Sequence, residues 1–286
     1  MLTIFTIPKP FVKNIAITQT NAINSWLCLD KNVEILLFGD EQGMQEITLR
    51  DPRIRHISSI KKNQQGTPFL SDVFKKARAV AKHNLLCYAS SDIILLPSLI
   101  PILKKLPENK HITVLARRTD IDIDKPIDFS NNWEAKLVDK AKSHGKLHGF
   151  SALDLIIFPK NLPMNMPDFL VGRPGWDNAL IYQLIRQRIT IIDASHVITA
   201  IHQNHDYSHH AEGKKGVWQG SEAWHNFSLA GGLSQMATIK NARYLLTENG
   251  LARPPFTHLL YSYISLFYPI RKLLGIKRWV YTTAKL

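Results

Sequence analysis

The sequence predicts an α/β fold in which a mostly parallel central sheet is flanked by helices. Strand-like and helix-like segments alternate from the first residues, and this alternation is typical of parallel strands that are connected through helices. The chain has 286 residues, of which 45% are hydrophobic, so it can bury one large core. We expect a single domain over residues 1–250, followed by a basic amphipathic helical extension over residues 251–286.

The first half of the chain shows the alternation most clearly. Apolar runs that end at Pro, Gly or Asp predict strands, and segments with helical periodicity between them predict helices. The predicted strands cover residues 2–7, 33–38, 53–57, 85–92 and 111–116. The predicted helices cover residues 13–29, 68–83 and 98–106. The strand that ends at Asp92 is the central one of this set.

The second half is less regular. We predict helices over residues 133–143 and 176–188, a strand over residues 151–158, and one or two strands over residues 189–201. Residues 159–174 form a loop rich in Pro, Met and Asn, and residues 222–246 are expected to be helical in two pieces. The polar stretch 202–220 has no periodicity, so we predict a long loop, which in a compact domain is usually functional or disordered.

The C-terminal segment carries much of the positive charge of the chain, whose formal net charge is +13. After Glu248 the sequence contains no acidic residue, while aromatic residues alternate with six cations: Arg253, Arg271, Lys272, Lys277, Arg278 and Lys285. This composition suits an anionic membrane surface, and it equally suits a C-terminal helix that packs on the core with a basic outer face. No RRM, KH or zinc-finger signature indicates a nucleic-acid partner.

Cysteine usage and the N-terminus indicate the compartment. Cys28 and Cys87 both lie in apolar runs, which argues against a disulfide framework and for a reducing environment. The start of the chain lacks the features of a signal peptide, and no apolar run reaches the roughly 18 residues of a membrane-spanning helix. We therefore expect a cytoplasmic protein, with peripheral association at a membrane.

Three polar clusters follow predicted strands or precede helices, at positions where open α/β sheets bind ligands. The first is Ser90-Ser91-Asp92, in which a carboxylate stands between two apolar runs. Burying such a charge is costly unless a cation pairs with it, although Asp at the end of a strand also commonly forms a turn. Asp92 is therefore either a turn residue or a metal ligand.

The second cluster surrounds Asp177 at the start of a predicted helix. Asp177 could act chemically or simply stabilise the first turn of its helix, and Arg173 could form a loop ion pair or an anion clamp. The third cluster begins with His202 and His205, directly after a predicted buried strand. Imidazole together with carboxylate suits Mn²⁺, Zn²⁺ or Fe²⁺, so we expect these histidines to be metal ligands.

The order of these features resembles that of nucleotide-sugar-dependent glycosyltransferases with the GT-A fold, similar to family 2. The resemblance covers roughly residues 2–210 and implies a single Rossmann-like domain. It rests on five features in order: an opening strand ending in Thr6-Ile7-Pro8-Lys9-Pro10, a second strand ending at Asp40, a DxD-like triplet ending at Asp92, an acid at a helix start (Asp177), and a late strand followed by His202 and His205.

The resemblance implies roles for individual residues. Asp92, with His202 or His205, would hold Mn²⁺ or Mg²⁺ on the diphosphate of the donor, and Asp177 would be the base of an inverting reaction. The expected contacts with the nucleotide sugar are Thr6, Lys9, Asp40, Ser91, Arg117, Asp120, Arg173 and Trp176. For Arg117 and Asp120 a charged edge turn is the alternative, and for Trp176 simple packing.

Two departures from the family pattern concern the acids. Ser90 stands where the family often has the first carboxylate of its DxD motif, and Gly175-Trp176-Asp177 lacks the usual Glu before the Asp. We predict a metal-dependent glycosyltransferase whose acceptor is a saccharide, a lipid-linked glycan or a protein. The alternatives are an HD-type metal phosphohydrolase, suggested by His205-Asp206, and a non-catalytic module that binds nucleotide sugars or glycans.

Overall fold

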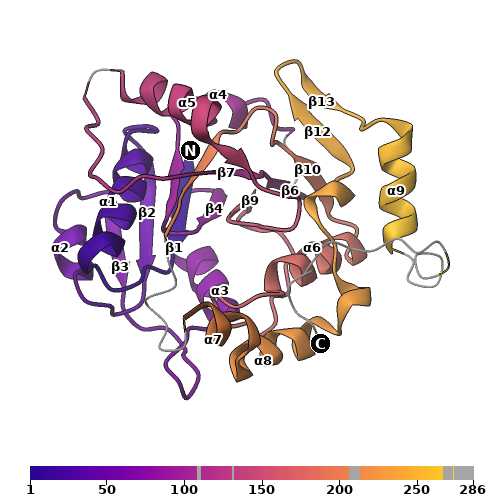
Figure 1. Ribbon diagram of the computed structural model, residues 1–286, viewed down its shortest axis with the longest axis horizontal. Helices are drawn as coiled ribbons and strands as arrows, with labels where there is room; N and C mark the ends of the chain where they lie inside the picture. Colours follow the sequence, from indigo (N-terminus) through magenta and orange to yellow (C-terminus); the bar gives the residue numbers. More distant parts are fainter. Residues whose placement is uncertain (108–110, 131, 206–212, 267–272, 274–286) are drawn as a thin grey trace.

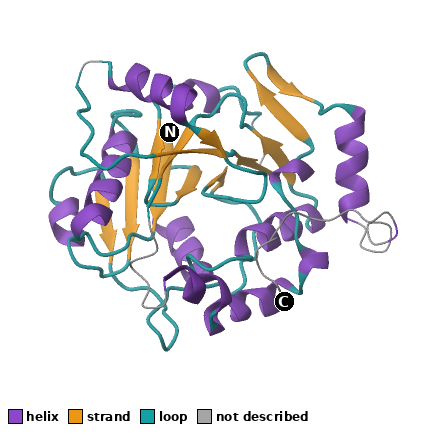
Figure 2. Cartoon of the chain, viewed as in Figure 1, coloured by secondary structure: helices purple, strands orange, loops and turns teal. Residues whose placement is uncertain are grey.

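The computed structural model describes residues 1–107, 111–130, 132–205, 213–266 and 273. It has an α/β architecture built around a large twisted sheet with helices on both faces (Figures 1 and 2). In spatial order, the nine strands of this sheet are β13 (Gly250–Ala252), β12 (Tyr244–Thr247), β10 (Thr190–Asp193), β6 (Ile112–Leu115), β9 (Leu155–Pro159), β4 (Leu85–Ala89), β1 (Leu2–Thr6), β2 (Glu34–Phe38) and β3 (Ile54–Ile57).

The large sheet is mostly parallel, which confirms the predicted fold class. Strand β1 pairs in parallel with β2 and β4, β2 pairs in parallel with β3, and β10 pairs in parallel with β6 and β12. Strand β9 runs antiparallel between β4 and β6, and β13 is an antiparallel edge strand. Strands β1 and β2 are buried along their whole length, as expected for strands with helices on both faces.

A second, smaller sheet lies beyond the ends of the central strands. Its strands, in order, are β5 (Ile93–Leu95), β11 (Ala200–Gln203), β7 (Arg118–Ile121) and β8 (Lys146–Leu147). Strand β11 is antiparallel to β5 and parallel to β7, with His202 opposite both Ile93 and Asp120. This sheet brings a late segment of the chain against the residues that follow β4.

Helices lie on both faces of the large sheet, and one helix packs on the smaller sheet. Their bounds are α1 (Lys13–Leu27), α2 (Met44–Thr48), α3 (Leu70–Val80), α4 (Leu99–Leu103), α5 (Trp133–His144), α6 (Trp176–Arg186), α7 (Gly213–Gln219), α8 (Ser221–Ala230) and α9 (Phe256–Leu266), with 3₁₀ turns η1 (Leu233–Gln235) and η2 (Ile239–Asn241). Apolar residues of α3 and α6 pack on one face, and those of α1 and α4 pack on the other.

Strand β1 shows how the alternation of side chains builds the two cores. Phe5 points into the core under α3, where its ring lies 5.0 Å from the Phe74 ring and 5.6 Å from the Tyr88 ring. Its neighbour Ile4 belongs to the opposite core, with Trp26 of α1. Because successive side chains of a strand point to opposite faces, one strand anchors both helix layers. Tyr88 extends this aromatic core to the floor of the cavity that is described below.

The central strand is shorter than the sequence predicts, because it ends at Ala89 and not at Asp92. The backbone N–H of Ser90 donates to the carbonyl of Asp154 at 2.9 Å, and the N–H of Ile93 donates back to the carbonyl of Ser90 at 3.0 Å. The chain therefore turns at Ser90–Asp92, and the second apolar run becomes β5 in the smaller sheet. This turn places Asp92 at the junction of the two sheets.

Two predictions for the second half of the chain are wrong. Part of the predicted loop 202–220 is regular structure, since β11 continues to Gln203 and α7 follows from Gly213. The predicted helical segment 222–246 ends at Ala230, because Gly231 and Gly232 have positive φ angles of 72° and 81°. Residues 244–252 instead form a β-hairpin, in which Thr247 pairs with Gly250 across the turn Glu248-Asn249, and Gly250 has φ 104°.

The C-terminal part begins with α9, which follows the β12–β13 hairpin at one edge of the molecule (Figure 1). Most of the predicted extension after Leu266 falls outside the described residues. Within the ranges that the structure describes, no helix combines the length and the apolar character needed to cross a membrane.

Candidate functional site

A cavity of about 490 Å³ opens where β4 and β11 end and α6 begins. It brings together members of all three polar clusters that the sequence predicts, although the cluster that ends at Asp92 lies far along the chain from the clusters around Asp177 and His202. The lining residues with polar or aromatic side chains are Lys9, Tyr88, Ser90, Ser91, Asp92, Arg118, His148, Ser151, Asp154, Arg173, Trp176, Asp177, His202, His205 and Trp218.

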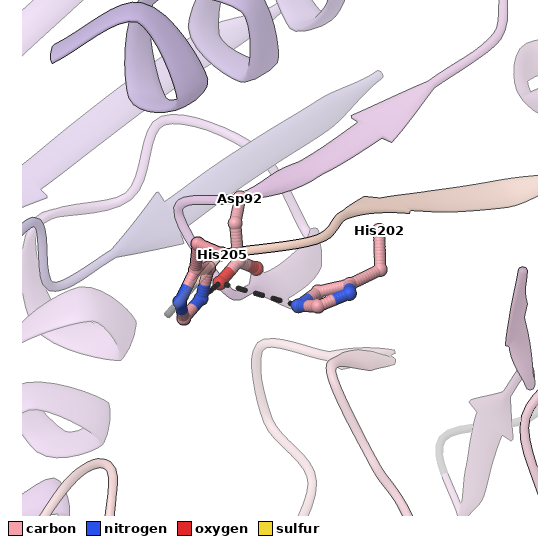
Figure 3. A group of neighbouring side chains, drawn as sticks. All are labelled: Asp92, His202 and His205. Atoms are coloured by element: carbon pink, nitrogen blue, oxygen red, sulfur yellow. Dashed lines mark hydrogen bonds and ion pairs between the residues drawn. The ribbon is translucent and has the colours of Figure 1, made fainter. Parts of the chain in front are cut away.

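Three potential metal ligands converge on one side of this cavity (Figure 3). The ligand atoms of Asp92, His202 and His205 all lie within 4.8 Å of one another. Asp92 Oδ2 is 3.0 Å from His205 Nε2 and 3.7 Å from His202 Nε2. Asp92 comes from the turn after β4, and the histidines come from β11 and the residues after it, so the junction of the two sheets creates the cluster.

Hydrogen bonds of Gln203 hold the end of β11 against the turn that contains Asp92. The backbone N–H of Gln203 donates to the carbonyl of Asp92 at 3.2 Å, and the side-chain amide of Gln203 donates to the same carbonyl at 3.2 Å. The Gln203 amide also donates to the carbonyl of Thr18 in α1 at 2.8 Å. Gln203 is fully buried, so this contact fixes the end of β11 relative to Asp92.

Asp120 orients His202 from the side away from Asp92. Its Oδ1 lies 3.0 Å from His202 Nδ1, and its Oδ2 lies 2.9 Å from His148 Nδ1. With Nδ1 directed to a carboxylate, the Nε2 atom of His202 is left to face Asp92, which is the usual arrangement behind a metal-binding histidine. Burial raises the pKa of Asp120, but His148, His202 and Arg118 outweigh it and hold the pKa well below its usual range.

The three residues fit a divalent transition metal. Asp92 Oδ1 is buried and has no hydrogen-bond partner among the described residues, and such a carboxylate oxygen suits a cation. Burial raises the pKa of Asp92, but the charge of His202 and the hydrogen bond from His205 lower it more, so the carboxylate is ionised. Two imidazoles and a carboxylate favour Mn²⁺, Fe²⁺ or Zn²⁺ over Mg²⁺, which prefers oxygen ligands.

A second carboxylate does lie beside Ser90, although the DxD-like triplet lacks it. Asp154, just before β9, accepts a hydrogen bond from Ser90 Oγ at 3.1 Å through Oδ1. Its Oδ2 pairs with Arg118 Nη1 at 2.6 Å, and Arg118 Nε lies 2.8 Å from Asp120 Oδ1. Arg118 is held charged, because these acids raise its pKa further than burial lowers it. Asp154 is thus neutralised by Arg118 and is not part of the metal cluster.

Asp177 lies in the first turn of α6 and lines the same cavity. Gly175, directly before the helix, has φ +96°, and an added Cβ would lie 3.3 Å from the Phe227 ring, so glycine is required for this tight entry. The N–H of Asn178 donates to Asp177 Oδ1 at 2.9 Å. Burial, together with the nearby negative charge of Asp154, raises the pKa of Asp177 to about 7.

Three of the residues predicted to contact the nucleotide sugar line the cavity: Lys9, Ser91 and Arg173. Arg173 makes the loop ion pair that the sequence allows, with Nη2 at 2.5 Å from Glu222 Oε2, and it also lines the cavity. Gln19 accepts a hydrogen bond from the backbone N–H of Lys9 at 2.7 Å and another from Ser91 Oγ at 2.9 Å. This glutamine connects the loop after β1 with the turn after β4.

Of the other predicted residues, Trp176 lines the cavity, whereas Thr6, Asp40 and Arg117 do not. Thr6 is fully buried in β1, and Asp40 is two-thirds exposed (66%) and pairs with Lys62 Nζ at 2.5 Å. Arg117 lies outside the lining residues: its Nε donates to the carbonyl of His148 at 2.7 Å, and its guanidinium stacks on the Phe150 ring at 4.2 Å. Trp176 lines the cavity but is mostly packed, with 7% of its surface exposed.

Sequence reasoning missed several lining residues, of which Asp154 is the most informative. A signal for it was present, because an acid directly before the apolar run Leu155–Phe158 repeats the situation of Asp92 after an apolar run. His148, Tyr88 and Trp218 gave no such signal.

No family model matches the sequence, and no curated protein matches it. The chain resembles glycosyltransferases of known structure. One is a mannosyltransferase from Pyrobaculum calidifontis in complex with GDP-Man and Mn²⁺, with 13% identity, a TM-score of 0.44, and coverage of 96% of this chain and 78% of that one. Another is glucosyl-3-phosphoglycerate synthase from Mycobacterium tuberculosis in complex with Mn²⁺ and UDP, with 12% identity, a TM-score of 0.45, and coverage of 81% and 80%.

TarS from S. aureus, residues 1–349 in complex with UDP-GlcNAc, is similar at 12% identity with a TM-score of 0.47. The match covers 72% of this chain, which spans 59% of the TarS structure.

Proposed function

We propose that this protein transfers a sugar from a nucleotide-sugar donor to a hydroxyl group of an acceptor, with the help of a divalent metal. The observation that carries the proposal is the meeting, in one cavity, of the Asp92–His202–His205 cluster with Asp177, a carboxyl group whose pKa is about 7. The three-residue cluster would hold the metal, and Asp177 would accept a proton.

Asp92, His202 and His205 would hold the metal, and Asp120 would keep His202 in the right tautomer. When bound, the metal would neutralise the negative charge that develops on the departing nucleoside diphosphate. The imidazole pair favours Mn²⁺ over Mg²⁺ for this role. Lys9 lines the same cavity and adds positive charge to the region where the diphosphate would lie, whereas the charge of Arg118 is shared with Asp154 and Asp120.

Asp177 is suited to be the general base. A base works best when its pKa is near the working pH, and burial brings the pKa of Asp177 to about 7. Asp177 would take the proton of the acceptor hydroxyl while the acceptor oxygen bonds to the anomeric carbon. As this bond forms, the bond from that carbon to the diphosphate breaks, and its electron pair leaves with the nucleoside diphosphate.

The acceptor would approach over the part of the cavity that α7 forms. Val217 and Trp218 of α7 line the cavity, as does Trp176 of α6, and aromatic rings of this kind offer apolar faces to sugar rings. A saccharide, a lipid-linked glycan or a glycosylated protein could all present such a ring. Both cysteines are free thiols, in keeping with a cytoplasmic enzyme.

A transfer assay tests this proposal. Purified protein is incubated with a panel of UDP-, GDP- and dTDP-sugars, with Mn²⁺, Mg²⁺ or EDTA, and the release of nucleoside diphosphate is measured. We expect release with at least one donor in Mn²⁺, loss of nucleotide binding in Asp92→Ala and His205→Ala, and loss of transfer with retained binding in Asp177→Asn. His144→Ala and Asp124→Asn, on exposed residues outside the cavity, are the matched controls.

The outcomes separate the alternatives. Binding of a nucleotide sugar without turnover by the wild type, under all conditions and acceptors, would support a non-catalytic binding module and refute the enzyme. The fold argues against the HD-type phosphohydrolase, because that class is all-helical and carries its His-Asp pair within a helix. Here the described chain is α/β, and His205 follows strand β11.

A further inference from the structure

His148 lines the cavity from the side of the smaller sheet, directly after strand β8. It is not a member of the metal cluster, and the proposed transfer gives it no task. Its side chain is 36% exposed, twice the fraction of Asp120, its hydrogen-bond partner (18%). One edge of this imidazole is therefore held by the protein, and the rest of the ring is accessible.

The backbone alone anchors the segment around His148. Strand β8 pairs with β7, and the backbone N–H of His148 donates to the carbonyl of Arg118 at 2.9 Å. The carbonyl of His148 accepts a hydrogen bond from Arg117 Nε at 2.7 Å. Because these contacts already fix the segment, the imidazole is not needed to hold it in place.

Asp120 fixes the tautomer of His148. Asp120 Oδ2 lies 2.9 Å from His148 Nδ1, and Asp120 Oδ1 lies 2.8 Å from Arg118 Nε. The carboxylate that pairs with this guanidinium is ionised, and an ionised carboxylate can only accept hydrogen bonds. Nδ1 of His148 therefore carries the hydrogen, and Nε2 of the neutral ring is an acceptor.

The acceptor nitrogen of His148 faces the cavity. Asp120 is not among the residues that line the cavity, so the ring turns its Nδ1 edge away from the cavity and its Nε2 edge towards it. Within the described ranges of the chain, no protein group donates a hydrogen bond to Nε2. Such an acceptor suits a ligand hydroxyl, which can donate, and does not suit an ionised phosphate, which can only accept.

We propose that His148 Nε2 accepts a hydrogen bond from a hydroxyl group of the sugar substrate and so selects sugars that carry this hydroxyl. The inference rests on the proposed glycosyl transfer. Asp120 is the positioning residue, and it holds His148 and His202 with its two oxygens. A sugar without the hydroxyl would leave Nε2 unpaired in the cavity, which disfavours its binding.

Two substitutions separate the contact with the sugar from the contact with Asp120. In His148→Asn the amide nitrogen comes close to the place of Nδ1, so the donor to Asp120 is kept and Nε2 is lost. In His148→Gln the longer side chain keeps an acceptor near the place of Nε2 and loses the donor at Nδ1. The matched control is His144→Asn, on an exposed histidine outside the cavity whose Nδ1 also has a hydrogen-bond partner.

Calorimetric titration in Mn²⁺ measures the contact. UDP-, GDP- and dTDP-sugars are each compared with the nucleoside diphosphate alone. We expect His148→Asn to bind the nucleoside diphosphate like the wild type and to bind the nucleotide sugar about tenfold more weakly. His148→Gln should lie between them, and His144→Asn should match the wild type. A loss of this size in the KM for the acceptor, with donor binding unchanged, would support the contact and assign the hydroxyl to the acceptor sugar.

Wild-type affinity of His148→Asn for both the nucleotide sugar and the acceptor would overturn the proposal. An equal loss for the nucleoside diphosphate alone would also overturn it, because His148 would then act on the metal site through Asp120. If the wild type binds no nucleotide sugar at all, the proposed transfer is refuted and the role of His148 with it. A ¹⁵N NMR spectrum of the wild type at pH 8 adds a test that needs no ligand: His148 should be the Nδ1–H tautomer, and the Nε2–H tautomer would contradict the proposal.

Discussion

Replacing Asp177 by Asn should stabilise the protein at high pH while it abolishes the proposed transfer. The two side chains have nearly the same shape, but only Asp must carry a buried charge above its pKa. In the folded protein this pKa is about 7, against 3.8 for an ordinary aspartate. The folded state therefore holds a proton over a pH range in which the unfolded state has lost it.

The sign and size of the effect follow from this difference. A carboxyl group whose pKa is raised by folding stabilises the folded state at low pH, and this contribution is lost as the pH rises towards the folded pKa. Between pH 5 and pH 8 the loss amounts to about 2.5 kcal/mol. Because Asn cannot titrate, the difference in unfolding free energy between Asp177→Asn and the wild type should grow by that amount.

Urea unfolding at pH 5, 6, 7 and 8 measures this difference. Asp124→Asn makes the same chemical change on an exposed residue and reports any effect of the substitution itself. A difference between Asp177→Asn and the wild type that stays constant from pH 5 to pH 8 would refute the raised pKa, and with it the reason for choosing Asp177 as the base.

Three other predictions concern the same cavity. The kcat/KM for transfer should rise about tenfold per pH unit below pH 7 and level off above it, as Asp177 ionises, and a pH-rate profile with a flat acid limb would contradict this. Arg118→Met leaves Asp154 without its ion-pair partner and Asp120 with His148 and His202 only, and it should lower the unfolding free energy in urea by about 3 kcal/mol; an unchanged midpoint would show that the Arg118 pairs are not important. Gly175→Ala should lower it by about 2 kcal/mol, because φ is +96° and the new Cβ meets Phe227, whereas Gly149→Ala, where an added Cβ has open space, should change it little.

The sequence predicted those parts of the fold that depend on local patterns. Strands β1 and β2 were found because each is a short apolar run closed by Pro or Gly. The α6 start was found because a glycine precedes a periodic segment. The hairpin at residues 244–252 was missed although Asn249 and Gly250 favour a turn, because the apolar residues before them also fit a helical period.

The site was harder to predict wherever a contact joins distant strands. Asp154 lies beside Ser90 only because β9 inserts antiparallel next to β4, and no local pattern encodes that pairing. Arg117 and Arg118 are neighbours in sequence, but only Arg118 belongs to β7 and lines the cavity, and no local pattern encodes the pairing of β7 with β11 that decides this. Asp40 follows β2 as predicted, yet Lys62 from a later loop pairs with it.

Most of the proposed chemistry depends on the cation site that we propose at Asp92, and one titration tests it directly. Free Mn²⁺ gives a strong EPR signal in water that disappears when the ion binds to a protein. We expect the wild type and His144→Ala to bind about one equivalent of Mn²⁺ and to remove the corresponding signal. Asp92→Asn and His205→Ala should leave the signal unchanged. Equal Mn²⁺ binding by the wild type and Asp92→Asn would contradict the assignment of the metal to this cluster.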